Sequence, residues 1–374
     1  GIQLVDWATH EPEMIPGLST PASLRDEVAS RFGVEPADIC EETAHSVEGN
    51  RILSAHLEAR IRNKTGMSRH YLESADWDFF ITAFGEAHCA GHQWWHLHDP
   101  THLDHDPHMA ATTGDLMKDI YIALDRAVGE IVAAAGPDAR VIVLCSHGMG
   151  PLHGESVVLD EILRRLDSPQ AATSRPAFGA LKRLWYRLPS ALRGASALQA
   201  LKGRLLPSFH QSLLVPDRQS RRFFAIPYNP HAGAIRINLV GRESHGIVQP
   251  GAEYRQLCES LRAELSALVS PETGLPAVAE VFITADLFDG PFVDELPDLL
   301  VQWSPQTPPR SLSSPRIGTV PLPTMHGRTG DHTRDGLYIA LGPGLDPGRT
   351  DRSVAIVDFA PTFAALLGVP ASAA

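Results

Sequence analysis

Four histidines in three separate parts of the chain form the pattern that most strongly suggests chemistry. His88 and His92 are four residues apart, which places both side chains on one face of a helical turn or a tight loop. His147 directly follows the apolar run at residues 141–146, and His332 stands among glycines shortly before another apolar run. Neutral imidazoles gathered from such segments are typical ligands of a zinc-type ion. For His88 and His92 alone, the alternative is a hydrogen-bonded pair at a sheet edge.

Two further side chains could complete this metal site. Glu86 precedes His88 by two residues and could serve as a third ligand, as an outer partner that orients a ligand, or as a weak candidate for a catalytic group. His326 lies close to His332, and glycines beside both allow the backbone to approach a ligand closely. The residues alone leave open which of these two histidines is the ligand.

Three arginines are candidates for binding an anionic group. Arg328 lies near His332 and could hold two oxygens of a phosphate or sulfate in a bidentate way, which also makes it a weak candidate for a catalytic residue. The alternative for Arg328 is an ordinary surface arginine. Arg236 and Arg242, in the segment at 233–244, are further candidates for anion contact.

A dense group of histidines and aspartates follows His92. Seven of the 18 histidines fall between His88 and His108, so this stretch predicts a polar loop that is solvated or faces a substrate. An additional metal site is the alternative interpretation. The group consists of His96, His98, His102, His105 and His108, together with Asp99, Asp104 and Asp106.

The spacing of apolar residues predicts the elements that must position these side chains. Short apolar runs predict strands at residues 79–84, 141–146, 280–285, 298–303 and 337–342, with another strand from residue 233. Helical spacing is found at residues 23–32, 51–62, 115–135, 254–268 and 357–368. Strand, helix and strand in succession predict βαβ units and a mainly parallel sheet, with the ligand site beyond the carboxyl ends of its strands.

The composition argues against several classes of protein. The 374 residues include 32 Lys and Arg against 44 Asp and Glu, a net charge of −12, so the chain lacks the basic footprint of a generic nucleic-acid binder. No run approaches about 18 consecutive apolar residues, and we therefore expect no transmembrane segment. Four cysteines lie far apart and no secretory signal is evident, which favours free thiols and a cytoplasmic location.

Residues 164–222 differ in charge from the rest of the chain. They hold 12 Lys and Arg against two Asp, and apolar residues from Phe178 to Leu188 form a stripe between basic ones. This pattern predicts a basic amphipathic helix within an insertion. The simplest interpretation is that the insertion packs on the main sheet. The alternatives are a lid or cap that attracts an anionic substrate, and a peripheral contact with a membrane surface.

Four segments together resemble the alkaline phosphatase superfamily, on the branch that contains type I phosphodiesterases, nucleotide pyrophosphatases, sulfatases and cofactor-independent phosphoglycerate mutases. Phe84–His92 is similar to a metal motif of that family, and Leu144–Met149 to a motif at the end of a strand. Arg328–Gly344 is similar to its late histidine motif, and Ile356–Gly368 to its terminal helix. The resemblance extends from about residue 78 to the end of the chain, insertions aside.

The resemblance implies an α/β fold, namely a three-layer α/β/α sandwich with a mostly parallel central sheet. Residues 1–374 would form a single domain of this kind, with 164–222 inserted. In the family, an aspartate and the Thr or Ser nucleophile come from an N-terminal segment that has no counterpart in residues 1–75. We therefore expect the nucleophile to lie outside this chain.

The resemblance also implies a site for two metal ions. His92 and His332 would serve the first ion and His147 the second, and the distance from His332 to the following strand favours it over His326. His88 stands where the family has an aspartate ligand of the first ion. Three neutral imidazoles leave a zinc ion its full charge and an open position, so this site could still bind metal.

The second ion would lose a ligand, because Ser146 stands where the family has an aspartate directly before His147. A site without carboxylates binds hard cations poorly. We therefore expect one tightly held divalent ion, with zinc first and manganese or magnesium as alternatives, and a second ion that is weak or missing.

The function implied is a metal-dependent hydrolase that acts on small anionic phosphate or sulfate esters, with phosphodiesterase activity first. Two alternatives remain open at this point. One is a degenerate member of the family that binds an anionic ligand or partner without turnover. The other is a transferase that moves a phospho group onto a glycan or a lipid. The residues do not distinguish between substrates, leaving groups or oligomeric states.

Overall fold

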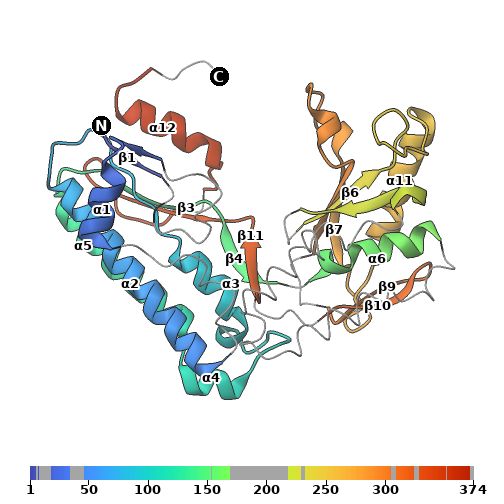
Figure 1. Ribbon diagram of the computed structural model, residues 1–374, viewed down its shortest axis with the longest axis horizontal. Helices are drawn as coiled ribbons and strands as arrows, with labels where there is room; N and C mark the ends of the chain where they lie inside the picture. Colours follow the sequence, from blue (N-terminus) through green and yellow to red (C-terminus); the bar gives the residue numbers. More distant parts are fainter. Residues whose placement is uncertain are drawn as a thin grey trace. The chain divides into compact units, whose positions relative to one another are not determined.

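The computed structural model describes residues 1–374 except 6, 8–17, 34–45, 153, 169–217, 229–231, 305–308, 324–327, 351 and 371–374. It is a mixed α/β protein whose chain divides into two compact units (Figure 1). Unit 1 contains residues 1–152 and 325–374, and unit 2 contains residues 153–324. All four histidines predicted as metal ligands belong to unit 1.

Helices are the main secondary structure of the described part of unit 1. They are α1 (Leu24–Phe32), α2 (Val47–Leu72), α3 (Glu86–His98), α4 (Pro107–Thr113), α5 (Leu116–Ala135), the 3-10 turn η5 (Ile356–Asp358) and α12 (Phe359–Leu366). The predicted helix at 115–135 is confirmed, and its ends follow from local chemistry. Asp115 accepts a hydrogen bond from the Lys118 amide at one end, and Gly136 takes a positive φ of 82° at the other.

The apolar faces of α2, α3 and α5 pack together into one core. Its most completely buried members include Leu57, Trp94 and Ile120, one from each helix. The Trp94 indole donates a hydrogen bond of 2.8 Å to the Asn50 side chain, so the buried polar group keeps a partner. Burying side chains of this size contributes about 1.5–3 kcal/mol each, which is what holds α3 in place.

The strands of unit 1 form short antiparallel pairs. β1 (Gln3–Leu4) pairs with β2 (Ser19–Thr20), β3 (Val141–Cys145) with β12 (Leu337–Leu341), and β4 (Gly148–Pro151) with β11 (Gly330–Thr333). In the last pair His332 lies opposite Met149, close to His147 at the start of β4. Figure 1 shows β4 and β11 side by side. This ribbon therefore brings two distant histidine segments together.

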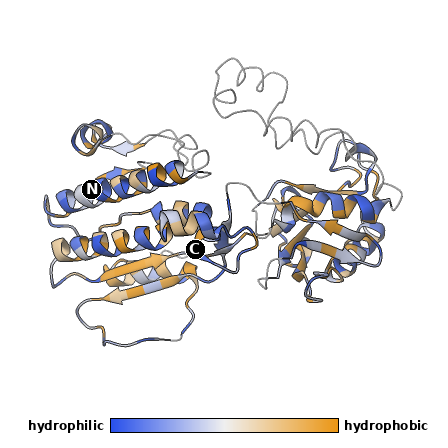
Figure 2. Ribbon diagram, turned by 90° about the horizontal axis from the view of Figure 1, so that it is seen from below, coloured by the Kyte–Doolittle hydropathy of each residue, from blue (hydrophilic) through white to orange (hydrophobic). Residues whose placement is uncertain are grey.

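Unit 2 is built on an antiparallel sheet. Its strands are β5 (Phe223–Ile226), β6 (Ala232–Ile237), β8 (Leu299–Trp303) and β7 (Val278–Ile283), in that spatial order. The helices α6 (Glu155–Asp167) and α11 (Ala252–Ser266) bury Ile162 and Leu265 in the same core as Ile235 of the sheet. The unit also contains the pair β9 (Ser311–Ser314) and β10 (Gly318–Pro321), and the 3-10 turns η2 (Arg218–Ser220), η3 (Thr284–Asp286) and η4 (Val293–Glu295). Figure 2 shows apolar residues along the strands of both units.

The expected mostly parallel central sheet is not found among the described strands, whose ladders are all antiparallel. A continuous apolar run predicts a buried strand but neither its partner nor its direction. β3 pairs with β12, which comes from the C-terminal part of the chain, and not with a strand at 79–84. Residues 79–84 form no strand, and Phe79 and Ile81 are 48% and 76% exposed. The single domain expected over residues 1–374 stays a prediction.

Two expectations concern surfaces of the chain. Among the described helices, none is both long and apolar enough to cross a lipid bilayer. The basic amphipathic helix expected within residues 164–222 lies in the part that the structure leaves undescribed, at 169–217. Its assignment as a lid, a cap or a membrane contact therefore stays a prediction.

Candidate metal centre

His88 and His92 lie on α3. The helix extends to His98 and so includes the first residues of the segment expected to be a polar loop. The four-residue spacing puts both imidazoles on one face of α3, with ring centroids 4.3 Å apart. His92 is buried at 6% exposure and His88 is half-buried. The expectation that these two side chains share one face is therefore confirmed.

β11 approaches α3 closely and brings His332 to this face. The Thr329 amide donates a hydrogen bond of 2.7 Å to the backbone carbonyl of His92. A methyl group on Gly330 would collide with the backbone carbonyl oxygen of Gly91, so only glycine allows this contact between strand and helix. The glycine beside His332 therefore serves the approach of two backbones.

The imidazoles of His88, His92, His147 and His332 meet in one cluster. His88 Nδ1 lies 3.1 Å from His332 Nε2, and His88 Nε2 lies 3.1 Å from His92 Nε2. The rings of His147 and His332 are 4.0 Å apart between centroids. Nitrogens that share a tetrahedral zinc ion are expected at about 3.3 Å from one another, given Zn–N distances of about 2.0–2.1 Å. The separations in the cluster are close to this value.

Two overlapping groups in this cluster have ligand atoms within 4.8 Å of one another. The first consists of His88, His147 and His332, and we call it the three-histidine position. The second consists of His92, Asp331 and His332, and we call it the carboxylate position. His332 belongs to both positions, so the two positions overlap at this residue.

The hydrogen bonds of two histidines show which ring nitrogen is free to act as a ligand. His92 Nδ1 lies 2.7 Å from the carbonyl oxygen of Gly330, and a carbonyl can only accept. Nδ1 therefore carries the proton, and Nε2 turns its lone pair into the cluster. His147 Nδ1 donates in the same way to the Gly148 carbonyl at 3.0 Å. A backbone carbonyl in this role is the usual outer partner of a metal-bound histidine.

Burial keeps His92 and His96 of α3 neutral. Desolvation lowers the pKa of His92 to about 4, although the hydrogen bond to Gly330 raises it. Desolvation likewise lowers the pKa of His96 to about 4, and the neighbouring His102 adds to this effect. A neutral imidazole is the form that binds metal, so His92 is in the ligand state throughout the physiological range.

These two pKa values predict how the stability of the metal-free protein depends on pH. Below pH 6.5 the unfolded chain protonates these histidines, while the folded chain resists protonation until about pH 4. The free energy of unfolding should therefore fall as the pH drops through this window, with about one extra proton taken up per histidine on unfolding. Denaturant titrations in EDTA would measure it. In the His96→Gln variant, unfolding should take up about one proton fewer in this pH range. An unchanged pH profile would contradict the lowered pKa of His96.

Glu86 is buried and fully enclosed at the start of α3, where it forms an ion-pair network with two cations of α2. Lys64 Nζ lies 2.9 Å and Arg60 Nε 3.3 Å from Glu86 Oε1, and all three side chains are at most 6% exposed. Among the described residues, Glu86 belongs to neither metal position. Its proposed roles as a ligand or a catalytic group receive no support from this geometry, because its ion pairs connect α3 to α2. Its role as an outer partner that orients a ligand stays a prediction.

The remaining histidines of this stretch are spread over helices and turns, and do not form the single loop expected. His98 at the end of α3 pairs with Asp115 at 2.9 Å. His102 Nε2 donates to the Thr329 carbonyl at 3.1 Å, and His96 Nδ1 lies 2.9 Å from the Thr329 hydroxyl. His105 Nδ1 donates to the backbone carbonyl of His96, and His108 lies exposed on α4. Two of these side chains, His96 and His102, therefore hold α3 and its following turn against the segment that leads into β11.

Arg328 and Asp331 lie at the edge of the cluster. Arg328 Nη2 donates to His92 Nε2 at 2.9 Å and contacts Asp331 Oδ1 at 3.3 Å. Asp331 is 3% exposed, and its Oδ1 also accepts from the His332 amide. The sequence reasoning missed Asp331, although its position directly before His332 was a usable signal. His326 lies outside the described residues.

The other two candidate anion-binding arginines belong to unit 2, where carboxylates already engage them. Arg242 binds both oxygens of the buried Asp298, at 2.8 and 2.6 Å. Arg236 Nε lies 2.7 Å from Glu243. These pairs and the Tyr254 hydroxyl, which donates to Asp298, give the network a role in the packing of unit 2. Anion binding by Arg236 and Arg242 stays a prediction that nothing in these contacts favours.

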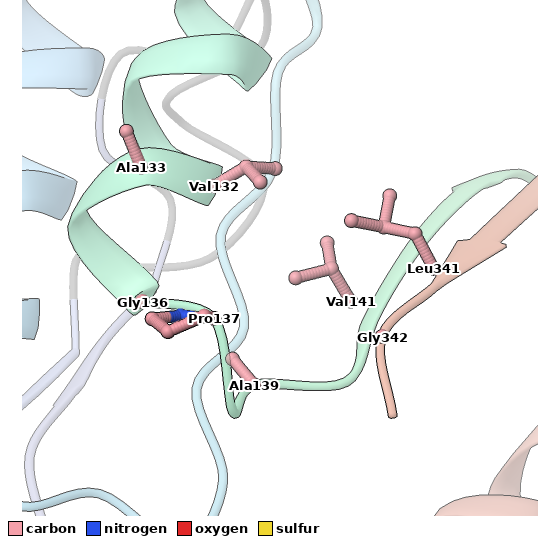
Figure 3. Close-up of a pocket in the computed structure, with 8 residues that line it drawn as sticks. All are labelled: Val132, Ala133, Gly136, Pro137, Ala139, Val141, Leu341 and Gly342. Carbon is pink, nitrogen blue, oxygen red and sulfur yellow. The ribbon is translucent and has the colours of Figure 1, made fainter. Parts of the chain in front are cut away.

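An apolar pocket of about 320 Å³ lies at the end of β3 remote from His147 (Figure 3). The end of α5 contributes Val132, Ala133 and Gly136 to its wall, and the facing strands contribute Val141 and Leu341. None of the histidines of the cluster lines it. The pocket therefore lacks the polar groups that would bind an anionic ester.

One comparison with known proteins gave a match. A model of the type I phosphodiesterase / nucleotide pyrophosphatase family matches residues 6–203, more than half of the chain. The match includes His88, His92 and His147, and it ends before Arg328, Asp331 and His332. No curated protein and no solved structure matches the sequence.

Proposed function

Because the chain belongs to the type I phosphodiesterase / nucleotide pyrophosphatase family, a group of phosphoric ester hydrolases within the alkaline phosphatase superfamily, we propose that it hydrolyses small phosphodiesters at a metal centre. The ligands are His88, His147 and His332. The single observation that carries the proposal is that imidazoles from α3, β11 and the start of β4 converge with ligand atoms within 4.8 Å.

The donor set fits a borderline-soft divalent cation. Three imidazoles suit zinc, whereas magnesium and calcium prefer oxygen ligands. The hydrogen bond from His147 Nδ1 to the Gly148 carbonyl leaves Nε2 as the coordinating atom. The same arrangement leaves at least one coordination position for a substrate oxygen. We therefore favour zinc over manganese and magnesium.

When bound, a divalent cation of this kind would act as a Lewis acid toward the ester oxygen. The protein supplies the rest of the environment. His92 keeps a neutral imidazole beside His88, and Arg328 presents a guanidinium that can donate to the anionic oxygens of a phosphate. These local positive groups favour an anionic ester in a protein whose net charge is −12.

Hydrolysis of bis(p-nitrophenyl) phosphate tests the proposal directly. The full chain would be stripped with EDTA and then assayed with zinc, manganese or magnesium, alongside p-nitrophenyl phosphate and p-nitrophenyl sulfate. We expect turnover that needs the added metal, is highest with zinc, and is faster for the diester than for the monoester or the sulfate.

Two alanine variants sharpen this assay. His147→Ala removes one proposed ligand and should lower the rate by at least about 100-fold. Loss of a residue that only orients a ligand typically lowers activity by about 10–100-fold, and loss of the ligand itself should lower it more. His108→Ala changes an exposed histidine outside the cluster and should retain the rate. Tight zinc binding without turnover of any of the three esters would instead favour a protein that binds an anionic ligand.

A further inference from the structure

The residues of the carboxylate position could hold a second metal cation, but the guanidinium of Arg328 already contacts two of them. The carboxylate position brings together a histidine lone pair and a buried carboxylate, which are the usual surroundings of a divalent cation. Arg328 Nη2 lies between them, 2.9 Å from His92 Nε2 and 3.3 Å from Asp331 Oδ1. The guanidinium thus contacts two of the three groups that would hold a second ion.

The position of the proton on His92 determines which residue is the donor in the hydrogen bond between His92 and Arg328. His92 Nδ1 donates to Gly330, so Nε2 has only a lone pair to offer, and Arg328 must be the donor. A guanidinium has no acceptor and keeps its charge at every pH that a folded protein tolerates. The lone pair that would bind a metal is therefore directed at a permanent cation of the protein itself.

We propose that Arg328 replaces the second metal ion of this centre, so that one divalent cation at the three-histidine position and one guanidinium at the carboxylate position together face the substrate. The inference rests on the proposed function and deepens it. His92 then acts as a positioning residue, because it contacts His88 Nε2 and not the ion.

This arrangement suits a substrate that carries one negative charge at the reacting phosphate. A phosphodiester has a single ionised oxygen, which one metal ion and one guanidinium can satisfy together. A monoester carries close to two charges at neutral pH, as the phosphate of a phosphorylated residue does, and is better matched by two divalent ions. The single charge of a phosphodiester therefore fits one metal ion and one guanidinium better than the charge of a monoester does.

Cobalt binding tests the inference without any assay of activity. Co²⁺ would be titrated into the EDTA-stripped full chain, with the visible absorption spectrum and the bound metal per chain as readouts. We expect one Co²⁺ per wild-type chain. Arg328→Met should admit a second Co²⁺ with a Kd below about 1 mM, because His92 Nε2 and Asp331 lose their cation. Adding Asp331→Asn to that variant should remove the second ion again.

Two further variants keep the test decisive. Arg328→Lys retains a positive charge and should still bind one Co²⁺, even if the methionine variant folds poorly. Arg334→Met changes an exposed neighbouring arginine and should also bind one. Two Co²⁺ ions in the wild-type protein, or one in Arg328→Met, would overturn the inference. No Co²⁺ bound to the wild-type protein would instead overturn the metal centre of the proposed function.

Discussion

The Glu86→Gln variant is expected to lose about 3–5 kcal/mol of the free energy of unfolding, the cost typical of breaking a buried ion pair by neutralising one partner. Glu86 is fully buried, and its two cationic partners, Lys64 and Arg60, are almost as enclosed. Glutamine has nearly the same shape, so the variant removes the charge and leaves the packing in place. Lys64 and Arg60 then both lose the carboxylate that lies beside them.

The surroundings of Lys64 explain why this loss is large. Burial lowers the pKa of Lys64, while the attraction of Glu86 raises it, so the charged lysine depends on this carboxylate. Without Glu86, the protein must deprotonate Lys64, admit water or open the contact between α2 and α3. Each route costs free energy, and the last also moves the helix that carries His88 and His92.

Chemical denaturation and hydrogen exchange of α3 would measure the effect. Exchange is useful because it reports on this helix alone in a chain with two compact units. The matched control is Glu130→Gln, which breaks an exposed ion pair with Arg69 and should cost no more than about 1 kcal/mol. Equal effects of the two substitutions would contradict the assignment of Glu86 as the buried anchor of α3.

The helices could be predicted because their signals are local. Residues 115–135 show apolar residues at helical spacing, with Asp115 before them and Gly136 after them, and the structure has a helix there. α3 was not predicted as a helix, since Gly91 and several histidines lower its intrinsic propensity. The burial of Trp94 and Glu86 against α2 overrides that preference, and such contacts cannot be read from spacing.

Strand pairing could not be predicted for a different reason. The strand predicted at 141–146 is found as β3 at Val141–Cys145, but its partner β12 lies almost two hundred residues later in the chain and runs antiparallel to it. The hydrophobic pattern locates a strand and leaves its partner and direction to the tertiary fold. It also did not give the burial of this pair, since no residue of β3 or β12 is fully buried. The same limit hid the partners of Glu86, because nothing in the spacing of Arg60 and Lys64 relates them to α3.

More of the candidate site than of the strand pairing could be predicted, since its four histidines converge as the sequence pattern implied. Its finer structure depends on the register of β11. Pairing of His332 with Met149 places Asp331 and Arg328 on the edge next to His92. A shift of the register by one residue would move the side chain of each to the other face of the ribbon, so the roles of Asp331 and His332 become apparent only in the folded ribbon.

The largest effect on metal binding is expected for His332→Ala. His332 is the residue shared by the three-histidine and carboxylate positions, so among the described residues no set of three ligands survives its loss. We expect the affinity for zinc to fall by more than about 100-fold, beyond the range of about 10–100-fold that follows the loss of an outer partner of a ligand. Competition with a chromophoric chelator would measure it, with His108→Ala as the control that keeps full affinity.

The comparison with His92→Ala decides which of the two positions holds the ion. If zinc lies at the three-histidine position, His92 only orients His88 through the 3.1 Å contact between their Nε2 atoms, and its loss should cost about 10–100-fold. If zinc lies at the carboxylate position, His92 and Asp331 are ligands, and His92→Ala should match His332→Ala while His147→Ala has little effect. The arginine between His92 and Asp331 favours the first outcome, because an ion at the carboxylate position would have to displace a charge that the protein already holds there.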